Sequence, residues 1–136
     1  MESRRQHLLN EIARFEPIDG NWLHLDTLLI ELFTEGEVGP REQNAVFYLF
    51  ERYPEDDGAG VLWTALHGLE NAGRYAPLLV ASVRRMPSLM SLTMVRRLLN
   101  SGIQEVEGQV LYALLEEVSG SATVSEEMRQ EAKSLL

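Results

Sequence analysis

The sequence predicts an all-α protein of about eight helices in antiparallel pairs, arranged as a HEAT-like or irregular helical stack. Apolar residues recur at three- and four-residue spacing along most of the chain. Glycine or proline separates the apolar stretches, and no stretch makes a convincing strand. Short connections make consecutive helices antiparallel neighbours. The 136 residues suit a single helical domain, residues 1–136.

The first half of the chain predicts four helices, over residues 2–15, 21–36, 40–53 and 56–73. Pro40 suits a first helical position, and Pro54 stops that helix. The stripes expected to face inward are Trp22, Leu25, Leu28, Leu29, Leu32 and Phe33, then Val46, Leu49, Phe50 and Tyr53, then Leu62, Ala65, Leu66 and Leu69.

The second half predicts four more helices, over residues 75–86 and 89–102, then from residue 106 and from residue 123. Pro87 separates the first two, and Thr123 and Glu126 have the spacing of a capping box. The residues expected to face inward are Tyr75, Leu78, Leu79, Ser82, Val83 and Met86, then Leu89, Leu92, Val95 and Leu99, then Val106, Val110, Leu111, Leu114, Leu115 and Val118.

The net charge is concentrated in the first half. The formal charge is −9, and residues 1–72 hold fourteen Asp and Glu against five Arg, whereas residues 73–136 hold seven acidic and seven basic residues. Such a surface repels nucleic acid and anionic membranes and attracts basic partners, although it also serves plain solubility. Because no apolar run approaches the roughly 20 residues that span a bilayer, we expect a soluble, cytoplasmic protein.

Few residues suit catalysis. The chain has no Cys and three His, and it contains no phosphate-binding, dinucleotide or serine-hydrolase motif. His67 and Glu70 have the i, i+3 spacing of helix-bundle metal sites, but a second matching motif is absent. We therefore expect no enzyme activity, metal or cofactor. An enzyme that uses His67 and Glu70 is the alternative, and it requires a third ionisable group in the same pocket.

The features that favour partner binding are one aromatic side chain and two acidic loops. Trp63 and His67 are four residues apart and so lie on the same side of the predicted helix. Aromatic residues are enriched at binding hot spots, and burial of Trp63 in the core is the alternative. The loops on either side of residues 40–53 are acidic, and we expect them to form one acidic edge, with helix capping as the alternative. The candidate partner-binding residues are Glu35, Glu37, Glu55, Asp56, Asp57, Trp63, His67 and Glu70.

Residues 75–115 resemble a known family. A Tyr-Ala-Pro-Leu-Leu segment begins at Tyr75, an Arg pair precedes Pro87, and "RRLLNSG" is followed by a Leu-rich helix. The segment resembles the all-helical immunity proteins encoded beside bacterial polymorphic toxins, and as a helix pattern the resemblance covers residues 20–120. It implies a small cytoplasmic protein that binds one cognate toxin domain and blocks it, with no catalytic residues.

An acidic helical stack without a catalytic motif suits a stoichiometric inhibitor of a basic toxin, in particular a nuclease whose cleft holds phosphates. We expect the acidic residues to occlude a basic active-site surface. The alternative is a helical scaffold or adaptor protein unrelated to toxins. Residues 75–102 contain two pairs of arginines and no acidic residue. We expect these arginines on the outer sides of two adjacent helices, in ion pairs with acidic residues of neighbouring helices: Arg84, Arg85, Arg96 and Arg97.

Overall fold

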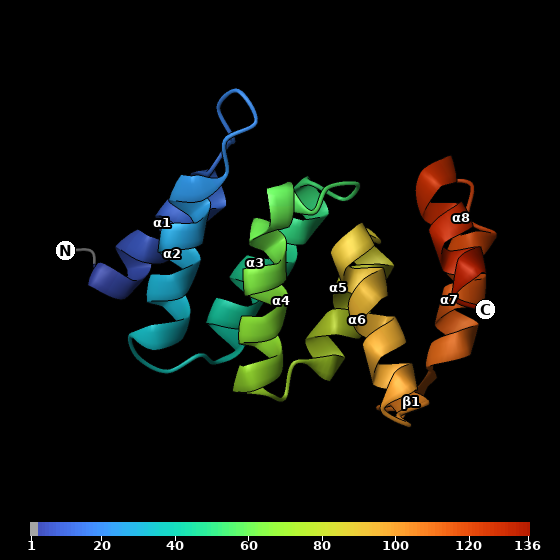
Figure 1. Ribbon diagram of the computed structural model, residues 1–136. Helices are drawn as coiled ribbons and strands as arrows, with labels where there is room; N and C mark the ends of the chain where they lie inside the picture. Colours follow the sequence, from blue (N-terminus) through green and yellow to red (C-terminus); the bar gives the residue numbers. More distant parts are fainter. Residues whose placement is uncertain (1–2) are drawn as a thin grey trace.

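The computed structural model describes residues 3–136, which form eight α-helices and one small hairpin (Figure 1). The all-α class is therefore confirmed for these residues. The elements are α1 (Arg4–Arg14), α2 (Leu23–Thr34), α3 (Pro40–Arg52), a 3-10 turn η1 (Gly58–Gly60), α4 (Val61–Ala72), α5 (Ala76–Arg85), α6 (Leu89–Asn100), β1 (Glu105–Val106), β2 (Gln109–Val110), α7 (Leu111–Ser119) and α8 (Glu126–Ser134). Glu2, where we expected the first helix to begin, lies outside the described residues.

The helices form antiparallel pairs that stand side by side in chain order (Figure 1). Between pairs, α1 contacts α3 and α3 contacts α5, whereas α2 contacts α4, which contacts α6. The odd and even helices therefore make two layers. Because the chain direction reverses at each loop, the α1–α2 and α3–α4 loops share one end of the stack, the upper end in Figure 1, and the α2–α3 and α4–α5 loops share the lower end.

The core lies between the two layers and includes most of the predicted apolar stripes, together with buried side chains that were not predicted, such as Phe47, Met90 and Met94. Leu25, Leu29 and Leu32 of α2 are fully enclosed, as are Leu62 and Leu66 of α4. Burying each such side chain contributes about 1.5–3 kcal/mol. α2 and α4 approach closely at Gly68, where the ring of the half-buried Phe33 occupies the space that a larger side chain would need.

Ion pairs between side chains connect neighbouring helix pairs. Arg85 of α5 lies 2.8 Å from the Glu51 carboxylate of α3, and Arg97 of α6 binds the Glu70 carboxylate of α4 through two hydrogen bonds of 2.7 and 2.8 Å. Internal pairing is thus confirmed for two of the four arginines of the basic stretch. Arg84 instead donates to the side-chain oxygen of Gln109.

The seventh helix begins at Leu111 and not at Val106. The residues before it form a hairpin in which Glu105 pairs with Val110 and Val106 with Gln109. Glu107 and Gly108 turn the chain with positive φ angles of 46° and 84°, as a two-residue hairpin turn requires. The turn points the Val110 side chain outward, where it is 45% exposed instead of buried. The expectations of no strand and of an inward Val110 are therefore wrong.

Two further helix ends differ from the sequence prediction. The fourth helix begins at Val61, because Asp57 caps the separate turn η1. α8 is capped by Ser125, whose hydroxyl accepts a hydrogen bond from the Met128 amide at 3.3 Å, and not by a capping box of Thr123. Met86, expected to face inward, is 42% exposed because α5 ends at the preceding residue.

Replacing Gly68 by Ala tests the packing of α2 on α4. A Cβ at residue 68 would lie 2.4 Å from the Phe33 ring, so Gly68→Ala is expected to lower the free energy of unfolding by about 1–3 kcal/mol in urea denaturation. In a Phe33→Ala background the same change is expected to be neutral or stabilising, since Ala is the better helix former by about 1 kcal/mol. Equal destabilisation in both backgrounds would contradict this contact.

Candidate protein-binding surface

The two acidic loops that we expected to form one edge lie at opposite ends of the stack. Glu35 and Glu37 precede α3 at the lower end, whereas the Glu55–Asp57 segment follows α3 at the upper end (Figure 1). α3 has 13 residues, and at 1.5 Å per residue it holds the loops roughly 20 Å apart. The expectation of a single edge built from both loops is therefore wrong.

Arginines of α1 hold the lower acidic loop. Arg4 lies 3.3 Å from the Glu35 carboxylate and 3.1 Å from that of Glu31. The Arg5 guanidinium donates to the carbonyl oxygens of Glu35 at 2.7 Å and of Glu37 at 2.5 Å. These contacts fasten the start of α3 to α1 and give the loop a structural role. Its part in partner binding stays a prediction.

Glu42 completes this lower anchor. Its carboxylate lies 3.0 Å from Arg41 and 3.6 Å from Arg5, and it accepts a hydrogen bond from the Gly39 amide at 3.0 Å. Burial of Glu42 on its own raises the pKa, but the hydrogen bonds from Arg41 and the backbone amides, together with the Arg41 charge, outweigh it. The pKa of Glu42 is therefore below its ordinary value of 4.5.

The upper end carries acidic side chains that arginines do not neutralise. Within the described residues, none of them has a Lys or Arg partner within ion-pair distance. All are exposed. They come from the α1–α2 and α3–α4 loops, and we call them the acidic edge: Glu16, Asp19, Glu55, Asp56 and Asp57.

Two of these carboxylates also shape their own loop. Asp56 accepts a hydrogen bond from the Gly58 amide at 2.8 Å, and Asp57 accepts one from the Ala59 amide at 3.1 Å. Asp57 thus caps the 3-10 turn η1, whereas the predicted helix itself, α4, has Gly60 as its N-cap. Each bond orders the loop and leaves further lone pairs on the carboxylate for a partner.

Arg52 fixes the acidic edge in place. At the C-terminal end of α3, its guanidinium donates to the carbonyl oxygens of Ile12 at 3.2 Å, Ala13 at 2.5 Å and Phe15. The hydroxyl of Tyr53 donates to the Phe15 carbonyl as well, at 3.0 Å. These carbonyls lie at the C-terminal end of α1, so the Arg52 and Tyr53 side chains join the start of the α1–α2 loop to the end of α3.

Trp22 fills the space between the same loops. Its ring lies 5.6 Å from the Phe15 ring and 5.0 Å, edge on, from the Tyr53 ring. Gly58 packs against the indole, where a Cβ would come within 3.0 Å, and its φ of 63° also favours glycine. The indole is therefore a core side chain that sets the spacing of the acidic edge.

The predicted α4 residues lie elsewhere, on the outer side of the even layer. Trp63 is half-buried against the core, and its ring lies 5.9 Å from that of the exposed His67. Glu70 is engaged by Arg97, and His67 lies 3.7 Å from the same carboxylate. The third ionisable group near His67 and Glu70 is thus Arg97, which binds the Glu70 carboxylate through two hydrogen bonds.

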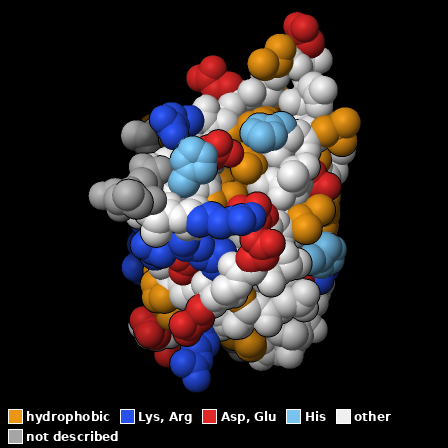
Figure 2. Space-filling view, turned by 90° about the vertical axis from the view of Figure 1, so that its left-hand side faces the viewer, with side chains coloured by type: hydrophobic (Ala, Val, Ile, Leu, Met, Phe, Trp, Pro, Cys, Tyr) orange, Lys and Arg blue, Asp and Glu red, His pale blue; other side chains and the backbone are white. Residues whose placement is uncertain are grey.

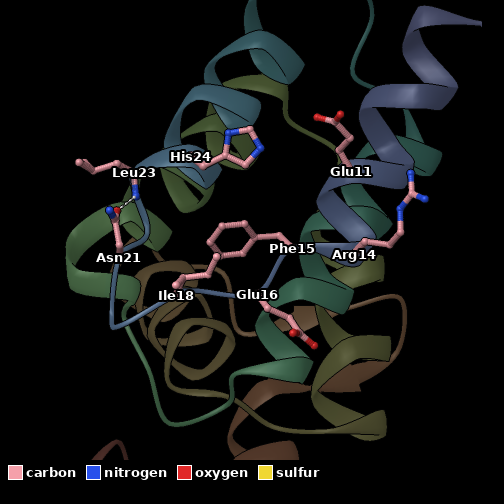
Figure 3. Close-up of a pocket in the computed structure, with 8 residues that line it drawn as sticks. All are labelled: Glu11, Arg14, Phe15, Glu16, Ile18, Asn21, Leu23 and His24. Atoms are coloured by element: carbon pink, nitrogen blue, oxygen red, sulfur yellow. Dashed lines mark hydrogen bonds between the residues drawn. The ribbon is translucent and has the colours of Figure 1, made fainter.

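A groove opens beside the acidic edge, at the α1 and α2 end of the stack (Figure 3). It has a volume of about 570 Å³. The rings of Phe15 and His24 form its middle, 6.4 Å apart, Ile18 lies beside Phe15, and Leu23 lines the outer margin of the groove. Figure 2 faces this end of the molecule and shows hydrophobic and acidic side chains together on the projecting upper loop.

Sequence reasoning missed Glu16, Asp19, Arg52 and the groove. The "DG" in "EPIDGNW" is a turn signal, and alternation of helix direction places the first and third loops at the same end. These two signals together could have located the acidic edge. The reach of Arg52 to three carbonyls has no sequence signal.

We compared the chain with protein-family models, curated proteins and solved structures, and none of them matches it. The HEAT-like description and the resemblance to immunity proteins therefore stay predictions. Within residues 3–136, no group of three or more His, Cys, Asp or Glu side chains could hold a metal ion. None of the helices in that part of the chain combines the length and hydropathy that crossing a membrane requires.

Acid titration tests the anchor at Glu42. Since folding lowers the pKa of Glu42 below its ordinary value of 4.5, the carboxylate stabilises the native state fully above about pH 4.5 and less as pH falls through the lower, folded pKa. The free energy of unfolding from urea denaturation is therefore expected to fall more steeply below pH 4.5 in the wild type than in Glu42→Gln. Parallel pH profiles of the two proteins would contradict the lowered pKa.

Proposed function

We propose that this protein is an immunity protein, which binds a cognate toxin domain through the upper end of its stack and covers a basic active-site surface. The observation that carries the proposal is the location of uncompensated charge. Glu35, Glu51 and Glu70 are engaged by arginines, whereas the carboxylates of the acidic edge have no such partner in the described residues. Other exposed carboxylates, such as Glu37 and Glu105, also lack one, but at the acidic edge two neighbouring loops bring five of them to one end of the molecule. A toxin cleft that binds phosphates is complementary to this edge.

The acidic edge has a preformed conformation, which supports inhibition by occlusion. Arg52 and Trp22 hold both loops before any partner arrives, so binding orders few groups and costs little conformational entropy. Exposed carboxylates of one sign steer a basic partner and raise the association rate. The resemblance of residues 75–115 to immunity proteins adds the class of partner, a toxin domain encoded beside this chain.

A helical adaptor is the second candidate, and one observation favours it. Large apolar side chains are exposed at both the first and the last helix pair: Ile18 and Leu23 lie before and at the start of α2, and Ile103 and Tyr112 lie before and within α7. Two separate apolar sites suit a protein that bridges two partners. An immunity protein needs only one of them.

Co-expression with the product of the adjacent gene tests the proposal. A 1:1 complex that abolishes the toxicity of that product is expected for the immunity function. A toxic product that neither binds the protein nor loses toxicity in its presence would contradict it. A complex in which the protein joins two other chains without changing toxicity would favour the adaptor.

Charge substitution within that complex tests the acidic edge. Glu16→Lys, Asp19→Asn and Glu55→Lys together make the edge more positive by five charges and leave the capping carboxylates of residues 56 and 57 unchanged. We expect association at low salt to slow by about tenfold or more, measured by surface plasmon resonance.

A matched variant makes the same charge change away from the edge. It carries Glu105→Lys, Glu107→Asn and Glu116→Lys, all exposed, with Glu107 at a positive φ like Asp19. Its association rate is expected to fall far less. Equal slowing by the two triple variants would remove the acidic edge from the binding surface.

A further inference from the structure

The groove beside the acidic edge exposes two large apolar side chains. Ile18 is 76% exposed and Leu23 is 71% exposed, and neither belongs to the core cluster. Keeping two aliphatic side chains in water beside a recess is costly to solubility and typical of a binding surface. Phe15, at the middle of the groove, is itself buried and offers an apolar floor.

The backbone presents these side chains in a fixed position. Ile18 and Asn21 form a β-bridge around a two-residue turn in which Asp19 and Gly20 have φ angles of 52° and 74°. The Asn21 side chain then accepts a hydrogen bond from the Leu23 amide at 2.9 Å, at the start of α2. The projecting α1–α2 loop is thus a tight turn whose two ends both border the groove (Figure 3).

The charge around the groove indicates which partner fits. Glu11 and Glu16 line it together with Arg14, and Asp19 stands at the tip of the same loop. Glu11 lies 2.9 Å from His7, so Glu16 and Asp19 are the carboxylates that keep the rim acidic against the single guanidinium. A second copy of this chain would bring its own acidic rim against this one, which like-charge repulsion disfavours. A basic segment meets attraction over the same area.

We infer that the groove receives a large apolar side chain flanked by Lys or Arg on an exposed segment of the protein partner. A volume of about 570 Å³ suits one or two such side chains and the backbone between them. Phe15 and Ile18 contact the apolar group, Leu23 contacts it at the outer margin of the groove, and the rim carboxylates contact the basic neighbours. The inference rests on the proposed function only for the identity of the partner, a toxin domain; its basic charge follows from the rim carboxylates, and its apolar anchor follows from the groove.

Short peptides test this inference without the toxin. The probes are peptides with two central Leu or Phe residues between pairs of Arg, and peptides of equal charge with Ser at the centre. In titrations of the ¹⁵N-labelled protein followed by NMR, we expect the apolar peptides to shift amides of residues 15–24. The Ser peptides are expected to bind at least tenfold more weakly, because they lack the apolar anchor.

Substitutions at exposed positions locate the binding. Ile18→Ser with Leu23→Ser is expected to weaken the apolar peptides at least tenfold, while circular dichroism shows an unchanged fold. Ile30→Ser is the control, since Ile30 is a half-exposed aliphatic residue of α2 outside the groove. Loss of binding in the control alone, or in neither variant, would overturn the inference.

The peptide charge supplies the remaining outcomes. Peptides with Glu in place of Arg are expected to bind at least tenfold more weakly, and equal binding would overturn the basic part of the inference. Equal binding of Leu and Ser peptides, or no binding of either, would overturn the apolar part. The protein could also discriminate among the peptides and yet fail to neutralise the product of the adjacent gene. That result would contradict the proposed function and support the specificity of the groove.

Discussion

The upper end of the molecule depends on the contact between Arg52 and the last carbonyls of α1. A helix end leaves four carbonyl groups without partners inside the helix. α1 and α3 run in the same direction, so the negative ends of both helix dipoles meet where the Arg52 guanidinium lies. One planar cation with five N–H donors satisfies carbonyls of one helix from the end of the other. The position of both upper loops, the enclosure of Trp22 and the wall of the groove follow from this contact.

The arginines explain how an acidic chain can be folded and still present acidic charge. Arg4 and Arg5 hold the lower loop, Arg52 holds the upper one, and Arg85 and Arg97 join neighbouring helix pairs. Nearly every one of these contacts links segments far apart in the sequence. Because these basic side chains are used internally, many carboxylates stay exposed without an arginine partner in the described residues, and those of the acidic edge are among them. The proposed binding surface is therefore a consequence of how the fold uses its cations.

Helix periodicity was sufficient to predict the class and most helix positions, because burial of one stripe per helix dominates folding. It failed over residues 106–110, where Glu107 and Gly108 provide a local turn that overrides the apolar spacing. The candidate site was predicted less well. The acidity of residues 55–57 was visible in the sequence, but its neighbours depend on which helix ends share a side. Arg52 binds carbonyl groups that are far from it in the sequence, so no local sequence pattern predicts its role.

Hydrogen exchange in the complex with the adjacent gene's product tests the central claim most directly, because it maps the covered surface without altering any side chain. The account predicts that binding slows exchange in the α1–α2 loop and in residues 54–60, while the lower loop at residues 35–39 and the hairpin at residues 105–110 exchange as in the free protein. Protection of the lower loop or the hairpin, with both upper loops unchanged, would contradict the assignment of the upper end as the binding surface.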